Sequence, residues 1–378
     1  MKTVRLGNYI EEHCEKNKNG EDIPVFSVTN TNGFCTEYFS KDVSSKDKSN
    51  YKIVYKGFFA YNPSRINVGS VDWLRNEEKV IVSPLYNVFS VSPELEKQYL
   101  YYFLKSERGK TLIKSKAEGS VRDNLKFSIL SDFPIPLPSV EEQRKFVSKL
   151  DKSNELIIKY KQLLEYYDSL IKSRFIEMFG DPVQNQMGWE KTELGNMCKE
   201  VRYGTSKPAT ENGKYTYLRM NNITFEGELD LANTKTIDIS DEELPKCSVQ
   251  KGDILFNRTN SIELCGKTCL YKLDETMVIA GYIIRVRVNE KLNPQYVSTF
   301  FNTKSIKKLL REMAKGAVNQ ANINAQEMQS IQIPVPPIAL QNEYDGFVQQ
   351  IDKSKFAVQK SLEKAETLYK SLMQEYFG

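Results

Sequence analysis

The chain has 378 residues, enough for two domains, because one hydrophobic core usually serves about 100–200 residues. A hydrophobic content of 40% and a charged content of 27% are ordinary for a soluble globular protein. The formal charge of +4 is compatible with nucleic-acid binding only if basic side chains cluster on one face. His13 is the only histidine, which excludes the usual Ser/His/Asp and Cys/His triads.

The sequence predicts a cytoplasmic protein without membrane segments. No apolar run approaches the roughly 20 residues that span a bilayer. The N-terminus, Met1–Arg5, opens into patterned sequence without an apolar signal segment. The six cysteines form no CxxC pair, so we expect reduced, mostly buried thiols.

The first third of the chain has the pattern of an α+β domain. Short β-branched and aromatic runs bounded by turn residues predict strands at 51–55, 79–82 and 88–91. A helical stretch follows at about 93–114. Three prolines at 134, 136 and 138 then keep the backbone extended, because proline disfavours helix in the residue before it.

A long helix follows these prolines. Ser139 and Glu142 have the spacing of a capping box, which pairs otherwise free amide groups at a helix start. Apolar residues then recur at steps of four and three, the pattern of a helix with a helical partner along one seam. We expect this seam to contain Phe146, Leu150, Ile157, Tyr160, Leu164, Tyr167 and Ile171.

The second half repeats this order. Strands are predicted at 253–256 and 282–288, a helical stretch at about 294–315, and a long helix at the end of the chain. The seam expected for this second helix contains Phe347, Ile351, Val358, Ala365, Leu368 and Leu372.

Sequence matches show that the chain is a tandem repeat. The matches occur in the same order in both halves: Leu6–Asn8 with Leu194–Asn196, Lys56–Asn62 with Lys251–Asn257, Gln98-Tyr99 with Gln295-Tyr296, Ile135–Pro138 with Ile333–Pro336, and Phe179-Gly180 with Phe377-Gly378. Several matches in register indicate a duplicated unit.

The repeat sets the expected architecture. Domain 1 covers residues 1–138, a first spacer helix and linker 139–187, domain 2 residues 188–337, and a second spacer helix 338–378. Each helix of roughly 40 residues would extend about 60 Å, longer than a domain of this size is wide. We therefore expect the two helices to pair as an antiparallel coiled coil with pseudo-two-fold symmetry. The alternative is that each helix lies on the core of its own domain.

No catalytic or metal site emerges from the motifs. Gly266-Lys267-Thr268 resembles the end of a phosphate-binding loop, but Ser261 stands where that motif needs glycine. Asn293-Pro294-Gln295-Tyr296 departs from the methyltransferase motif Asn-Pro-Pro-Tyr at Gln295. We predict a chain that is not an enzyme.

Polar loops at matching places in the two halves suit nucleic acid. Arg and Lys can bond guanine, Asn and Gln can bond adenine, and Ser or Thr can bond either. The candidate DNA-binding residues are Ser64, Arg65 and Arg122 in the first half and Tyr203, Thr205, Ser206, Lys207, Asn257, Arg258, Asn260, Asn319 and Gln320 in the second half.

With these features, the sequence resembles the specificity (S) subunits of Type I restriction–modification systems over essentially its whole length. The most specific parts are Gly252–Arg258, Asn322–Asn324 leading to Ile333–Pro337, and the helix that ends at Phe377-Gly378. The resemblance implies two target-recognition domains that read an asymmetric, bipartite double-stranded DNA target around an unread spacer. It also implies two methyltransferase (M) subunits and two restriction (R) subunits as partners.

Further implications concern chemistry. By resemblance, S-adenosylmethionine, ATP and Mg belong to the partner subunits, and this chain holds no cofactor. Ala339-Leu340 replaces an acidic pair found at Glu141-Glu142, so a partner contact made by that pair is in doubt in the second helix. Two alternatives remain: the recognition half of a fused methyltransferase–nuclease, which a complete repeat starting at Met1 disfavours, and a coiled-coil scaffold that binds protein partners.

Overall fold

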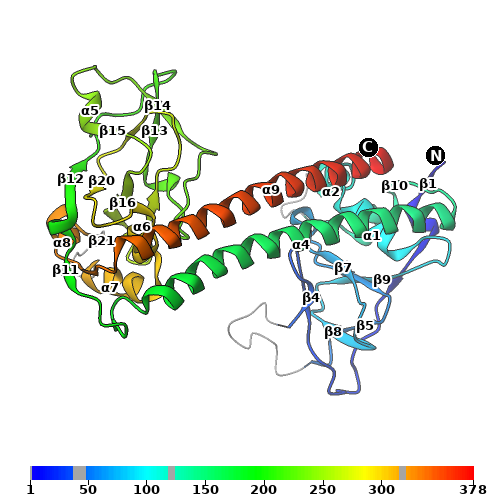
Figure 1. The fold of residues 1–378 in the computed structure, drawn as a ribbon. Helices are drawn as coiled ribbons and strands as arrows, with labels where there is room; N and C mark the ends of the chain where they lie inside the picture. Colours follow the sequence, from blue (N-terminus) through cyan, green and yellow to red (C-terminus); the bar gives the residue numbers. More distant parts are fainter. Residues whose placement is uncertain (1, 37–47, 118–123, 315–320) are drawn as a thin grey trace. The chain divides into compact units, whose positions relative to one another are not determined.

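The computed structural model describes residues 2–36, 48–117, 124–314 and 321–378 (Figure 1). The chain forms two compact units. Unit 1 comprises Met1–Lys161 and Gln359–Gly378, and unit 2 comprises Gln162–Val358. Two 40-residue helices, α4 (Val140–Phe179) and α9 (Ile338–Phe377), each contribute to both units. Over the described ranges, none of the helices combines the length and apolar character needed to span a membrane.

Unit 1 contains the strands β1 (Thr3–Arg5), β2 (Ile10–His13), β3 (Ser27–Thr29), β4 (Gly33–Cys35), β5 (Lys52–Tyr55), β6 (Phe59–Tyr61), β7 (Val71–Trp73), β8 (Lys79–Val82), β9 (Asn87–Val91) and β10 (Pro134–Pro136). It is built around an antiparallel sheet of four of these strands, in the order β2-β9-β6-β7. Smaller antiparallel pairs join β5 to β8, β3 to β4 and β1 to β10. The helices are α1 (Lys97–Lys105), α2 (Glu107–Ala117) and α3 (Phe127–Ser131).

Unit 2 has the same frame with additions. The antiparallel sheet β12-β20-β16-β18 corresponds to the large sheet of unit 1, and a second four-stranded sheet has the order β14-β13-β19-β15. The strands are β11 (Lys191–Glu193), β12 (Cys198–Tyr203), β13 (Tyr215–Leu218), β14 (Lys235–Ile237), β15 (Ser248–Val249), β16 (Ile254–Asn257), β17 (Thr259–Asn260), β18 (Thr268–Leu270), β19 (Met277–Ile279), β20 (Ile283–Val288), β21 (Ala321–Asn322) and β22 (Gln332–Pro334). The helices are α5 (Leu244–Cys247), α6 (Pro294–Asn302), α7 (Lys304–Ala314) and α8 (Ala325–Gln329).

The predicted strands are confirmed, and each predicted helical stretch is two helices. Ser106 separates α1 from α2, and Thr303 separates α6 from α7; both have extended backbone. The Ser106 hydroxyl donates to the Phe103 carbonyl, and the Thr303 hydroxyl donates to the Phe300 carbonyl. Ser and Thr side chains compete in this way with the helical hydrogen bonds and break the helix. The α+β class is confirmed.

Matching contacts in the two units support the sequence repeat. The Tyr99 hydroxyl donates to the Pro136 carbonyl over 2.8 Å in unit 1, and that of Tyr296 donates to the Pro334 carbonyl over 2.8 Å in unit 2. In the same way, the strand pair β1–β10 of unit 1 recurs as β11–β22 in unit 2. The duplicated segments therefore adopt the same local fold.

The start of α4 has the expected capping box. The Ser139 hydroxyl accepts the Glu142 amide proton over 3.3 Å, and the Glu142 carboxylate accepts from the Ser139 amide over 2.9 Å. One turn later, the buried Gln143 side chain accepts from the Glu96 amide and donates to the Glu94 carbonyl. These bonds attach the helix start to the loop before α1.

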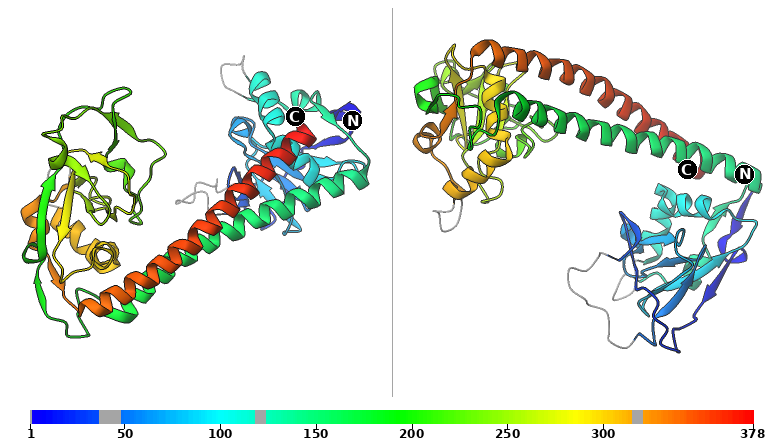
Figure 2. Two further views of the ribbon diagram at one scale, coloured as in Figure 1. Left: turned by 45° about the horizontal axis from the view of Figure 1, so that its top comes forward. Right: turned by 60° about the horizontal axis from the view of Figure 1, so that its bottom comes forward.

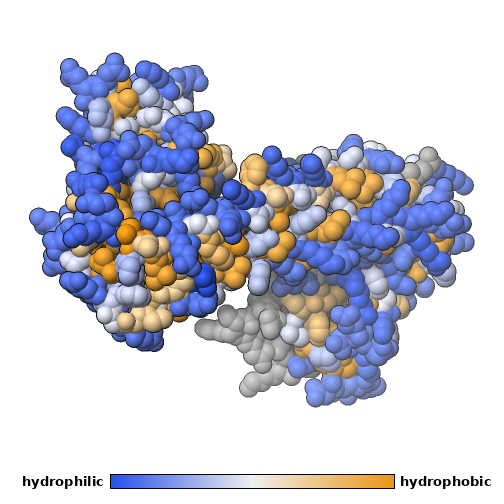
Figure 3. Space-filling view, viewed as in Figure 1, coloured by the Kyte–Doolittle hydropathy of each residue, from blue (hydrophilic) through white to orange (hydrophobic). Residues whose placement is uncertain are grey.

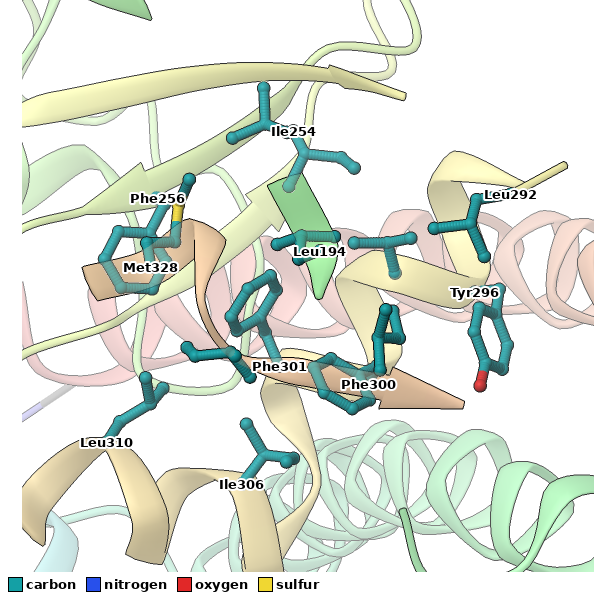
Figure 4. Close-up of a cluster of buried hydrophobic side chains, with 14 of the residues drawn as sticks. Leu194, Ile254, Phe256, Leu292, Tyr296, Phe300, Phe301, Ile306, Leu310 and Met328 are labelled. Atoms are coloured by element: carbon teal, nitrogen blue, oxygen red, sulfur yellow. The ribbon is translucent and has the colours of Figure 1, made fainter. Parts of the chain in front are cut away.

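The ends of the long helices complete the cores of both units. In unit 2, Phe175 and Phe179 of α4 lie 5.3 and 4.9 Å from the Tyr296 ring of α6, between ring centroids. This core also contains Phe300 and Phe301 of α6 itself, together with Leu194, Ile254, Phe256, Leu292, Ile306, Leu310 and Met328 (Figure 4). In unit 1, Phe377 of α9 lies 5.0 Å from Tyr99. The helix ends thus have large buried contacts outside any helix–helix seam.

In unit 1, the first part of α4 contacts the last part of α9. Phe146 stacks on Tyr376 with 3.6 Å between ring centroids, and Leu150 is fully buried. Leu368 departs from the expected seam because its side chain is 53% exposed. The next inward-facing residue after the buried Ala365 is Tyr369, four positions later, which packs against the core of unit 1. The interpretation of Leu368 as an interior residue is therefore corrected.

In unit 2, the last part of α4 contacts the first part of α9 (Figure 2). The Tyr344 hydroxyl donates to the Ile171 carbonyl over 3.2 Å, and Lys355 pairs with Asp168 over 2.6 Å. Tyr344 and Val348 are buried, whereas the predicted seam residues Phe347 and Ile351 are half-buried. Tyr344 lies one heptad before Ile351, on the expected face, whereas Val348 lies one position after Phe347. The buried face is therefore broader than the expected seam.

Candidate nucleic-acid interface

Arg258 and Tyr203 form the centre of a polar cluster in unit 2. Arg258 lies between β16 and β17, and its guanidinium carbon lies 4.9 Å from the centroid of the Tyr203 ring at the end of β12. A cation over an aromatic face in this way is held by the charge distribution of the ring. The Tyr203 hydroxyl accepts from the Ala325 amide over 2.9 Å. The Tyr203 side chain therefore has a contact at its hydroxyl and another over the face of its ring.

Asn322 fixes the orientation of the Arg258 side chain. The side-chain oxygen of Asn322, Oδ1, accepts from Arg258 Nε over 3.0 Å and from the Thr259 hydroxyl over 2.9 Å. Within the described ranges, the two terminal nitrogens of the Arg258 guanidinium have no hydrogen-bond partner, and the residue is half-buried. These nitrogens have the paired donor geometry that suits guanine O6 and N7.

Asn257 and Asn260, the other predicted residues of this strand end, differ in burial. Asn257 is fully buried, and its amide nitrogen faces the carbonyl oxygens of Tyr282 and Thr259 at 3.2 and 3.1 Å. Asn260 is half-buried and accepts from the Ser261 amide over 2.9 Å. The structure therefore places Asn257 behind the surface that carries Arg258.

The segment after β12 is braced by Glu243. Thr205 is buried, and its hydroxyl contacts the Glu243 carboxylate over 3.3 Å and accepts from the Lys207 amide. Lys207 is exposed and forms an ion pair with Glu243, which lowers the pKa of that carboxyl. Ser206, between them, is exposed. Thr205 is thus positioned to hold the turn, whereas Ser206 and Lys207 lie at its surface.

In unit 1, Ser64 and Arg65 follow β6, the place that Arg258 occupies after β16. Both are exposed, and the Ser64 amide and hydroxyl each donate to the Asn62 side-chain oxygen over 3.1 Å. The predicted residues Arg122, Asn319 and Gln320 lie outside the described residues. The structure thus brings together the unit 2 candidates between Tyr203 and Asn260 and places Ser64 and Arg65 at the matching loop of unit 1.

A groove that the sequence did not predict lies beside this cluster. It is lined by Lys207, Arg219, Lys235, Tyr217 and Tyr282, among others. The carbonyl of Tyr282 accepts from the Arg258 amide over 3.0 Å, so the groove adjoins the cluster. The β13–β14 end of unit 2 presents mostly hydrophilic side chains on the face drawn in Figure 3. Isolated basic residues in separate turns gave no sequence motif, which is why they were missed.

Gly266-Lys267-Thr268 supports this groove from inside. Lys267 is buried and donates to the Met220 carbonyl over 2.8 Å, and burial lowers the pKa of its ammonium. The Thr268 hydroxyl donates to the Gly266 carbonyl. Met220 lines the groove, so the lysine holds the backbone of one wall.

A buried ionic network stiffens the sheet beneath the cluster. Arg285 is 1% exposed and donates to Glu200 over 2.9 Å, and Arg287 binds both oxygens of Asp253 over 2.6 and 3.0 Å. Burial by itself raises the pKa of Glu200, but the attraction of Arg285 and of neighbouring arginines lowers it overall. Asp253, part of the Gly252–Arg258 motif, therefore has a structural role.

Comparisons with known proteins agree on one family. The family model described as "Type I restriction modification DNA specificity domain" matches residues 3–165 and 186–366. The chain is 24% identical over 299 residues to the type I restriction enzyme EcoKI specificity subunit of Escherichia coli strain K12, covering 74% of this chain and 64% of that protein. It is 28% identical over 193 residues to the putative MjaX specificity subunit of Methanocaldococcus jannaschii, covering 50% and 45% of the two chains.

The solved structures show the same fold. The S subunit of a Type I restriction–modification system from M. genitalium matches with a TM-score of 0.60 and 15% identity, covering 100% of this chain and 96% of that chain. The chain spans 64% and 45% of the length of the two curated relatives in these alignments. The family model covers most of the sequence, and this chain belongs to the type I restriction modification DNA specificity family.

Proposed function

We propose that the chain is a non-catalytic specificity subunit that reads a bipartite, asymmetric double-stranded DNA target and directs partner methyltransferase and restriction subunits to it. The observation that carries this proposal is the Arg258 cluster. Its guanidinium is oriented by Asn322 and Tyr203, while its two terminal nitrogens have no partner within the described ranges. An arginine pre-oriented in this way loses little conformational freedom when it bonds a base edge.

The proposed target-recognition domains are residues 1–138 and 188–337, and the proposed spacers are 139–187 and 338–378. We assign DNA contacts to Arg258, Tyr203, Ser206, Lys207 and Asn260, of which Arg258 reads a base edge, with Thr205 and Asn257 supporting them from buried positions. Ser64 and Arg65 are the corresponding candidates in unit 1, and Arg122, Asn319 and Gln320 belong to the same proposal. Loops of different composition in the two halves favour two different half-sites.

The proposed spacer is an antiparallel coiled coil of α4 and α9 with pseudo-two-fold symmetry. Two sets of contacts support it: Phe146 with Tyr376 inside unit 1, and Ile171 with Tyr344 inside unit 2. Further along α4 in unit 1, Ser153 contacts the earlier α9 residue Ala365; in unit 2, Asp168, which precedes Ile171, pairs with Lys355, which follows Tyr344. In each unit the α9 residue number thus falls as the α4 number rises, as antiparallel helices require. The seam would comprise the half-buried and buried positions already named, with Tyr369 in place of Leu368.

The partners proposed for this chain are two methyltransferase subunits and two restriction subunits. In this arrangement S-adenosylmethionine, ATP and Mg are bound by those subunits, and the present chain contributes the DNA-reading surfaces. Its role requires no proton or group transfer by its own side chains. It acts by difference in affinity, binding one DNA sequence more tightly than the others.

Selection from a pool of random DNA duplexes tests this proposal. The full chain is incubated with the pool, bound duplexes are amplified over several rounds, and the enriched sequences are read. We expect two short, unlike half-sites separated by a fixed number of unread base pairs. Enrichment of a single contiguous site, or no enrichment above the starting pool, would contradict the proposal.

A further inference from the structure

The groove in unit 2 has the charge of a site for a polyanion. Three basic side chains line it, Lys207 from the turn after β12, Arg219 after β13 and Lys235 at the start of β14. Among the described residues, none of the lining side chains carries a carboxylate. Glu243 forms an ion pair with Lys207, and among the described residues no carboxylate forms an ion pair with Arg219 or Lys235. The groove therefore keeps an excess of positive charge.

Two of these cations retain capacity for an anionic ligand. Lys235 is exposed, and within the described ranges its ammonium has no hydrogen bond or ion pair. Arg219 donates to the Asn233 carbonyl over 2.9 Å through one terminal nitrogen, while its Nε is buried without a partner. A guanidinium forms strong, charge-assisted hydrogen bonds with an anion that reaches its terminal nitrogens.

The walls of the groove are held in place by internal bonds. The Tyr217 hydroxyl donates to the carbonyls of Thr205 and Lys207 over 3.2 and 3.0 Å, and Lys267 holds the carbonyl of Met220. The groove is thus a shaped part of the domain, in addition to being a charged one. Tyr282, 55% exposed, lies where the groove meets the Arg258 cluster.

We infer that this groove binds the sugar–phosphate backbone of the DNA whose bases contact the Arg258 cluster, with Arg219 and Lys235 as phosphate-contacting residues. The inference rests on the proposed function and deepens it, because it separates a positioning surface from a base-reading surface within one domain. Phosphate contacts set the register of a protein on DNA and carry no sequence information of their own.

Salt dependence distinguishes the two surfaces. Each phosphate contact releases condensed counterions, so the logarithm of the binding constant falls against the logarithm of salt with a slope of about −0.9 per contact. We expect Lys235→Gln to make that slope shallower by about one and to weaken binding to target and scrambled duplexes alike. Arg219→Gln should do the same.

The experiment measures binding of the full chain to both duplexes from about 50 to 200 mM salt, the range over which phosphate contacts change affinity steeply. Lys251→Gln is the matched control, because it removes the same charge from the same unit at an exposed residue that pairs with Asp274 and does not line the groove. Thermal unfolding shows whether each variant is folded. Lys235→Gln is decisive, since the exposed Lys235 side chain forms no hydrogen bond or ion pair with the part of the chain that the structure describes.

The outcomes separate this inference from the function on which it rests. A slope unchanged by Lys235→Gln, or equally changed by Lys251→Gln, overturns the groove assignment even if the wild-type chain prefers its target. If Lys235→Gln loses affinity for the target duplex alone, the groove assignment is also overturned, because Lys235 would then read bases. A wild-type chain that binds both duplexes equally overturns the proposed function, while the slope still decides whether the groove binds phosphates.

Discussion

Phe377 packs against Tyr99 with 5.0 Å between ring centroids, so the penultimate residue of the chain completes the core of unit 1. In unit 2 the matching pair is Phe179 and Tyr296, at 4.9 Å. Phe179 ends the helix of the first sequence repeat, yet it packs in unit 2; Phe377 ends the second repeat and packs in unit 1. Each sequence repeat therefore supplies the last aromatic residue of the other unit.

Replacement of these aromatic residues should destabilise the units separately. Phe377→Ala and Phe179→Ala each remove a ring that is at most 2% exposed, and we expect a loss of about 3–5 kcal/mol in the free energy of unfolding. Chemical denaturation followed by circular dichroism measures the change. Ile176→Ala is the control, because this neighbouring α4 side chain is 41% exposed and should change stability by less than about 0.5 kcal/mol. Equal effects of Ile176→Ala and Phe179→Ala would contradict the packing described.

Arg258→Ala should weaken binding to the target far more than binding to random DNA. Loss of a bidentate base contact costs about 1–3 kcal/mol, or roughly 5- to 150-fold in affinity for the target. Fluorescence anisotropy with target and scrambled duplexes measures both affinities. Arg258→Lys is the informative partner variant, since it keeps the charge but loses the planar donor pair and the bond from Nε to Asn322. Equal losses on the two duplexes would show that Arg258 contacts phosphate and does not read bases.

Glu200→Gln should destabilise unit 2 in a pH-dependent manner. The folded-state pKa of Glu200 is lowered, so its carboxylate stabilises the fold above its unfolded pKa, and this stabilisation is lost as pH falls through the lowered folded value. We expect a difference of about 1.5–3 kcal/mol at pH 7, the range for hydrogen bonds to charged groups. Thermal unfolding of both proteins from neutral to acidic pH measures it.

The gap between wild type and Glu200→Gln should shrink below about pH 4, near the ordinary glutamate pKa. Glu290→Gln is the control, because the Glu290 side chain is 79% exposed and, among the described residues, its one ion pair is with the exposed Lys199. A gap that stays constant down to acidic pH would show that the charge of Glu200 is not what stabilises the network around Arg285.

Removal of one heptad from each long helix should shorten the unread spacer of the DNA target. Deletion of Leu156–Gln162 and Lys360–Glu366 together preserves the seven-residue phase of the seam and removes about 10 Å of helix. We expect the spacer to shorten by up to about three base pairs, since base pairs lie about 3.4 Å apart. Duplex selection with the shortened chain reads the new spacer. A folded variant with the original spacer would contradict the role of the helices in setting this distance.

Local features of the fold could be predicted because their signals are contained in short segments. The Ser139–Glu142 capping box, the strand at 79–82 and the 40-residue helices follow from spacing and periodicity alone. The breaks at Ser106 and Thr303 were missed because hydroxyl side chains also occur inside helices, and only their bonds to the preceding turn reveal the break.

The seam was harder to place, since apolar residues on a long helix serve more than one partner. Phe175 and Tyr344 were not assigned to it, yet they are fully buried because they also face α6. Leu368 fits a seven-residue repeat but is exposed, and Tyr369 takes the interior position. A helical pattern identifies an apolar stripe without saying which neighbour covers each residue.

The candidate site was predicted in part. Arg258 and Tyr203 were both named from loop chemistry, but their contact joins two distant segments and only the fold brings them together. Asn257 has the residue type of an adenine reader, yet it is fully buried because its amide serves the backbone of neighbouring strands. Arg219 and Lys235 gave no motif at all, since the groove they line is formed by separate turns.

Methylation mapping tests directly whether this chain sets the DNA sequence that a partner methyltransferase modifies. The chain is co-expressed with a methyltransferase subunit of a type I system, and methylated bases are mapped across the host DNA with and without this chain. We expect methylation at a split motif with a fixed unread spacer, present only when this chain is expressed and lost with Arg258→Ala. A methylation pattern that is the same in the absence of this chain would contradict its role as the specificity subunit.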